Sequence, residues 1–153
     1  MKKFKFRLES VRIDRKRTED FRLREWSIVN RMLNDLFTEK KQIEERITKA
    51  FDEMTEIKSA PRISLGIISE LENFIQGLKQ KLEWKKNEIS RAEKFVERKR
   101  LDWIQARQKR MILEKLKEKK IEEYKEEKKD KENKDLNDLY LMRARMQVVR
   151  DDL

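Results

Sequence analysis

An apolar stripe at seven-residue spacing runs from about Leu8 to Leu113 and is interrupted once, at residues 59–66. The interruption holds Pro61, which is the only proline in the sequence, and Gly66. These residues can stop one helix and allow a second to begin, and a short connection brings the two helices back against each other. The sequence therefore predicts an all-α fold: a long antiparallel two-helix coiled coil, or α-hairpin, with the second helix overhanging. Such a fold has few places for an active site, which favours a mechanical or adhesive function.

The stripe follows heptad spacing in both predicted helices. Alternating steps of three and four residues connect Trp26 to Ile57 and then Ile68 to Leu113. These steps place the a and d side chains on one face, here called the seam, and predict a left-handed pair. Upstream of Trp26 the same phase meets charged residues, so that end is expected to be looser or occupied by a partner: Arg12, Arg15, Glu19 and Arg22. The predicted boundaries define a single hairpin over 1–153, with helices at about 5–58 and 67–146, a turn at 59–66 and no pairing beyond about 114.

The position of the turn predicts which residues face each other. If it is centred near residues 60 and 61, paired residue numbers sum to about 121 in an antiparallel hairpin. Leu36 then faces Lys85, and Arg22 faces Lys99. This register predicts no buried salt-bridge network along the seam.

Composition narrows the possible functions. Charged residues make up 47% of the chain, which contains two glycines and neither cysteine nor histidine. This is typical of long helices and coiled coils, and the regular apolar spacing argues against disorder, the alternative for such a composition. Without cysteine there are no disulfides or zinc–thiolate sites, and no phosphate-binding glycine-rich loop is present. We expect no enzyme activity, catalytic residue, metal, cofactor or small-molecule substrate.

Charge and hydropathy bear on location and partners. The basic start lacks the apolar run of a signal peptide, and no segment approaches the roughly 18 to 20 apolar residues of a membrane span. The formal charge of +10 is concentrated in residues 1–24 and 85–110, each with ten basic and four acidic residues. Phenylalanines interleave with these charges, so a basic nucleic-acid-binding hairpin is one alternative. An acidic protein surface is favoured over nucleic acid because no reading helix or groove is evident.

Two further features suggest contact surfaces. Residues 114–135 contain nine basic and nine acidic residues and are expected to form a solvated single helix. An apolar cluster follows and is interpreted as a docking surface: Leu136, Leu139, Tyr140, Met142, Met146 and Val149. Trp84 falls at an outward heptad position and is a candidate hot spot. Phe51 and Phe74 flank the seam, where core packing is the alternative to partner contact.

Four segments carry a resemblance to a known family. Phe4–Val11, Asn73–Leu78, Leu113–Tyr124 and Lys134–Arg143 resemble FliJ-family proteins, the small coiled-coil component of the bacterial flagellar type III export apparatus. The resemblance implies a stalk, similar to the central stalk of rotary ATPases. Its terminal ends would enter a hexameric export ATPase ring, and its hairpin-turn portion would meet the membrane export gate and free export chaperones.

The resemblance also assigns residues to these contacts. Ring contacts would be made by Phe4, Phe6, Leu8, Val11, Leu113, Leu116, Tyr124, Leu136, Leu139 and Tyr140. Gate or chaperone contacts would be made by Phe51, Phe74, Leu78 and Trp84. The implied location is cytoplasmic, peripheral to the inner membrane at the flagellar base. The alternative from another class is a structural coiled-coil spacer or scaffold that works as a dimer or filament.

Overall fold

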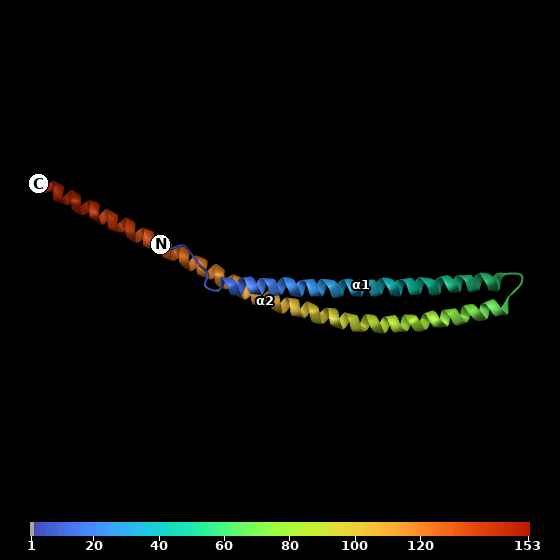
Figure 1. Cartoon of the computed structure of the whole chain (residues 1–153). Helices are drawn as coiled ribbons and strands as arrows, with labels where there is room; N and C mark the ends of the chain where they lie inside the picture. The colour runs from blue at the N-terminus through green and yellow to red at the C-terminus, as the bar shows by residue number, and fades with distance from the viewer. Residues whose placement is uncertain (1) are drawn as a thin grey trace. The chain divides into compact units, whose positions relative to one another are not determined.

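Two helices account for most of the chain. The computed structural model describes residues 2–153, with α1 at Glu9–Ser59 and α2 at Leu65–Asp151 (Figure 1). Pro61 lies in the short connection between them, and no strand occurs in the described range. The predicted all-α fold, two long helices packed against each other, is confirmed.

The helix ends differ from the predicted ones. α1 begins at Glu9 rather than about residue 5, because its first turn is closed by a hydrogen bond from the Arg12 amide to the Leu8 carbonyl. α2 begins at Leu65 rather than 67, and the Ile68 amide donates to the carbonyl of Ser64. The carboxyl end of α2 continues to Asp151, five residues past the predicted end.

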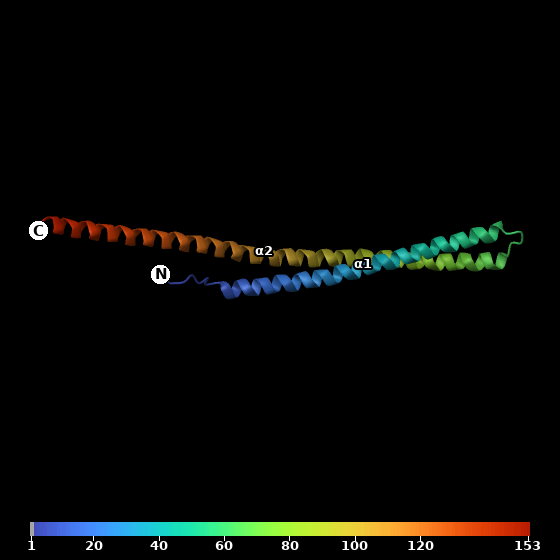
Figure 2. The same ribbon diagram turned by 90° about the horizontal axis from the view of Figure 1, so that it is seen from above.

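The chain divides into two compact units. The hairpin unit comprises Glu19–Gln105, and the terminal unit comprises residues 2–18 of the described range together with Ala106–Leu153. Within the hairpin unit, α1 and α2 lie side by side in antiparallel directions in both views (Figures 1 and 2).

The seam forms the core of the hairpin unit. Ala50, Met54 and Ile75 are buried together, and Ile47 and Leu71 pack against them. All the predicted seam positions from Trp26 to Ile57 and from Ile68 to Trp103 are buried or half-buried. Burial of this apolar stripe is what stabilises helices that would be marginal in isolation.

Ion pairs reveal the register of the hairpin unit. The Lys85 ammonium lies 2.6 Å from the Glu39 carboxylate, and the Lys99 ammonium lies 3.6 Å from the Glu25 carboxylate. Both cations remain at the seam, with side chains 18 and 20% exposed. The expected facing residues, Leu36 for Lys85 and Arg22 for Lys99, are therefore wrong, although the Glu39 side chain is 52% exposed and its pair with Lys85 is not a buried one. A hydrogen bond from Lys85 to Glu39 raises the pKa of the lysine.

The error in the register has a simple cause. Because α1 ends at Ser59 and α2 begins at Leu65, the connection is centred on Arg62 instead of on residues 60 and 61. The partners of the two seam lysines consequently lie three residues beyond Leu36 and Arg22 along α1. Glu39 and Glu25 directly precede the seam positions Lys40 and Trp26, so both lysines bond to carboxylates that flank the apolar seam.

Two tryptophans thicken the seam near the far end of the hairpin unit. The rings of Trp26 and Trp103 stack with centroids 5.3 Å apart and planes inclined by 22°. The buried indole N–H of Trp26 has no hydrogen-bond partner in the described part of the chain. The pair therefore contributes through ring packing rather than polar contacts.

Candidate partner-binding surfaces

The terminal unit begins with a non-helical segment, residues 2–8, here called the strap, which turns at Arg7 and Leu8 before α1. The ring of Phe4 contacts that of Tyr124 at a centroid distance of 5.6 Å, and the Tyr124 hydroxyl donates a 2.7 Å hydrogen bond to the Lys2 carbonyl. Phe4, Phe6 and Leu8 are half-buried. The intervening cations are exposed, so burial alternates along the strap: Lys3, Lys5 and Arg7.

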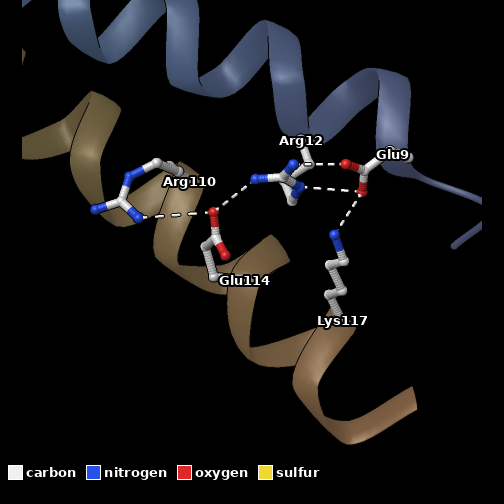
Figure 3. Close-up of polar contacts among 5 residues, drawn as sticks. All are labelled: Glu9, Arg12, Arg110, Glu114 and Lys117. Carbon is white, nitrogen blue, oxygen red and sulfur yellow. Dashed lines mark hydrogen bonds and ion pairs between the residues drawn. The ribbon is translucent and has the colours of Figure 1, made fainter. Parts of the chain in front are cut away.

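An ion cluster fixes the first turn of α1 beside α2 in the same unit (Figure 3). The Arg12 guanidinium contacts Glu9 at 2.5 Å and Glu114 at 3.0 Å. Lys117 lies 3.1 Å from Glu9, and Arg110 lies 3.8 Å from Glu114. The Arg12 hydrogen bond holds the pKa of Glu9 at about 2, and Glu9 and Glu114 raise the pKa of Arg12. Acidic partners thus satisfy the seam arginine at position 12.

Pairing in the terminal unit extends further than the sequence predicts. The expectation that α2 is unpaired beyond about residue 114 is wrong, because the strap, which precedes the first residue of α1, lies alongside α2 and reaches Tyr124. Leu113, Leu116 and Tyr124 are half-buried there, and Val11 is 37% exposed. From Lys125 onward every residue is exposed.

The exposed end of α2 carries an apolar surface. Leu136, Leu139 and Tyr140 are 53, 53 and 69% exposed, and the described residues provide nothing that covers them. Leu141 and Val148, which the heptad analysis missed, are also exposed. The consecutive residues 139–142 are all apolar or aromatic, and at about 100° per residue they point to several sides of the helix. We call residues 136–149 the apolar band, since this surface surrounds the helix instead of forming a stripe.

The hairpin unit has its own candidate surface around Trp84. This side chain is 66% exposed and, with Ile43, Arg46 and Lys81, lines a shallow pocket of about 370 Å³. The Arg46 guanidinium also lies 5.8 Å from the centre of the Phe74 ring. An exposed aromatic beside cations is a common arrangement at protein interfaces.

The other expected gate and chaperone residues fall into two groups. Phe51 and Phe74 are 43 and 46% exposed, and the Lys79 ammonium lies 5.3 Å from the Phe51 ring centre. Leu78 is only 2% exposed and belongs to the seam. The expected contact role of Leu78 is therefore incompatible with its position in this hairpin, because the opposing helix covers it.

The described residues contain neither a cluster of metal-ligating side chains nor a membrane-spanning helix. No group of three or more acidic, cysteine or histidine residues is placed to hold a metal ion. No helix in this range is long and apolar enough to cross a membrane.

Most of the chain matches one protein family. The family model described as flagellar FliJ protein matches residues 4–148, from the strap through most of the apolar band. The chain belongs to the FliJ family. The resemblance found in the sequence is thereby confirmed, and the FliJ assignment makes the chain a component of the flagellar export apparatus. No curated protein matches the chain. No solved structure matches it.

Proposed function

We propose that this FliJ-family protein is a non-enzymatic stalk that couples a hexameric export ATPase to the export gate. Its terminal unit inserts into the ATPase ring, and its hairpin unit contacts the cytoplasmic domain of the gate and free export chaperones. The protein then works in the cytoplasm, peripheral to the inner membrane at the base of the flagellum.

The apolar band is the observation that carries the ring contact. A helix that is apolar on several sides is normally buried on several sides. A flat surface or a single partner helix would cover only one side of residues 139–142, whereas a ring lumen surrounds an inserted helix. The family assignment points to another protein of the export apparatus as the partner, since the chain is a component of that apparatus.

The positive charge of the strap also supports insertion of the terminal unit into the ring. The strap carries four basic residues and no acidic one. An acidic or carbonyl-rich ring entrance would attract this end and speed association, and such attraction weakens as salt screens it. The apolar band would supply affinity that salt does not remove.

The ring contact is tested by truncating the apolar band. The triple variant Leu136→Ala, Leu139→Ala and Tyr140→Ala should lower capture of the purified hexameric export ATPase at least tenfold, since each exposed apolar side chain lost from an interface weakens binding by roughly 1 kcal/mol. A matched control truncates three exposed apolar residues near the connection in the hairpin unit: Ile63, Leu65 and Ile67. The control should bind as wild type, and both variants should retain their helical circular dichroism.

The ring contact is contradicted by a folded band variant that still binds the ATPase. If the band variant is as helical as wild type and captures the ATPase equally well, the apolar band does not provide the affinity. If band and control variants lose capture equally, the loss reflects general apolar truncation and not a specific contact.

The surface around Trp84 supports the second part of the proposal. The double variant Trp84→Ala and Phe74→Ala should reduce capture of the gate's cytoplasmic domain or of export chaperones, and should reduce swarming in soft agar. The control is Phe37→Ala and Phe95→Ala, because these rings are 42 and 45% exposed, close to Phe74 at 46%. If the first variant leaves capture and swarming intact, Phe74 and Trp84 serve only to flank the seam.

A further inference from the structure

We propose that the strap and α2 form a docking pocket for an acidic segment of a partner protein, which inserts one bulky apolar side chain between the two. This pocket lies in the terminal unit, apart from the apolar band that carries the affinity of the proposed ring contact, so the two proposals can fail separately.

The strap is held at both of its ends. At its start, Tyr124 bonds the Lys2 carbonyl and its ring meets Phe4. At its end, the chain enters α1 at Glu9, whose carboxylate is held by Arg12 and Lys117. A segment held at both ends keeps a defined path over α2, so the space between the anchors is part of the folded surface.

A pocket of about 280 Å³ occupies that space. Its apolar lining comes from two elements, with Phe4, Phe6 and Leu8 from the strap and Leu116 from α2. The volume is many times the roughly 30 Å³ that one molecule of liquid water occupies, so a bulky side chain can enter. An apolar pocket at the surface gains free energy when such a side chain displaces its water.

The cations around the pocket define the charge of the ligand. Lys5, Arg7 and Lys120 also line it. Lys120 is paired with Glu123 at 2.9 Å, whereas no ion pair within the described range engages Lys5 or Arg7. The carboxylates closest along the chain do not neutralise them, because Glu9 is already bound to Arg12 and Lys117. The pocket is therefore apolar inside and positive at its edge.

The chain turns at the edge of the pocket. The Glu9 amide donates a hydrogen bond to the Phe6 carbonyl, and Arg7 lies in the turn that this bond closes. Lys5 and Arg7 are both exposed beside the apolar lining. The ligand that fits is an acidic segment that carries one bulky apolar residue among its carboxylates.

A synthetic peptide tests the site without any presumed partner. The probe is a nine-residue peptide of Asp and Glu with one central Leu, titrated into the full-length ¹⁵N-labelled protein. Saturable shifts of amide signals should be confined to residues 2–8 and 113–124 and should weaken with added salt. Replacing the central Leu by Ala should weaken binding about tenfold, because most of the apolar contact is lost. Replacing the acidic residues by Asn and Gln should abolish it.

Protein variants supply the matched comparison. Lys5→Ala with Arg7→Ala should weaken binding about fivefold, as expected for two exposed charge contacts. Lys128→Ala with Lys129→Ala removes the same charge from the exposed part of α2 and should leave binding within twofold. The proposal is overturned if the two double variants bind equally, if the central-Ala peptide binds as well as the Leu peptide, or if the shifts fall outside the strap and 113–124. Any of these results leaves the ATPase-ring proposal standing, since that rests on the apolar band.

Discussion

Leu78 offers the sharpest test of the fold because sequence resemblance and structure assign it different roles. It was expected at a gate or chaperone contact, yet its side chain is 2% exposed in the seam of α1 and α2. Phe74 lies one helical turn away and is 46% exposed. Truncating each residue in turn separates loss of core packing from loss of a surface contact.

The size of the expected effect follows from burial. Burying a leucine side chain is worth about 1.5 to 3 kcal/mol, and replacing a core leucine by alanine typically costs about 2 to 5 kcal/mol. A cavity between only two helices opens readily to solvent, which favours the low end, so Leu78→Ala should lower the free energy of unfolding by about 2 kcal/mol. Phe74→Ala should lower it by less than about 1 kcal/mol, since half of the ring is already in water.

Urea denaturation followed by far-ultraviolet circular dichroism measures both values, and thermal melting should show a fall in Tm of about 4 to 8 °C for Leu78→Ala. Equal stability of the two variants would refute the assignment of Leu78 to the core. A Leu78→Ala protein that is fully stable and fails only to bind the export gate would restore the contact role.

Three further predictions concern polar contacts. Because the folded pKa of Glu9 is about 2, below its ordinary value of 4.5, its ion pairs stabilise the fold above pH 4.5 and lose that effect as the pH falls toward 2. Glu9→Gln should therefore be less stable than wild type at neutral pH, with the gap closing on acid titration by circular dichroism; a constant gap contradicts this. Lys85→Leu should raise Tm by a few degrees in calorimetry. The seam gains apolar area, while exposed ion pairs contribute only about 0 to 1 kcal/mol to stability. A clear fall in Tm would show that the two ion pairs of Lys85 contribute more than this. Tyr124→Phe should speed hydrogen exchange in the strap about fivefold by removing one hydrogen bond of about 1 kcal/mol, and unchanged exchange would show that ring packing alone holds the strap.

The seam could be predicted from sequence because it depends on local spacing. Steps of three and four residues from Trp26 to Ile57 place side chains on one face whatever lies opposite, and the structure buries or half-buries each of them. The pairing register depends on where the chain turns, which heptad spacing does not specify. Glu39 flanks the seam next to Lys40, so the position of the turn, and not the spacing of the seam, decides that Lys85 meets Glu39.

The candidate surfaces were predictable to different degrees. Trp84 was recognised as outward-facing from its heptad position, and its exposure agrees. The strap was missed although Phe4, Phe6 and Leu8 alternate with basic residues, because the heptad phase could be continued back through Leu8. Leu78 has the same apolar character whether it faces α1 or a partner, so only its packing distinguishes the two.

The hydrogen bond between Tyr124 and Lys2 joins residues 122 positions apart. Closing a loop of that length directly from the unfolded chain would cost considerable entropy. If the helices pair first near the connection and then progressively outward, each new contact closes only a few residues, and the strap is the last segment to dock. Unfolding reverses this order, so the strap is the first segment to detach, through local opening that leaves the hairpin unit intact. The strap is thus the segment most sensitive to the approach of a partner, and hydrogen exchange of its amides would report that contact.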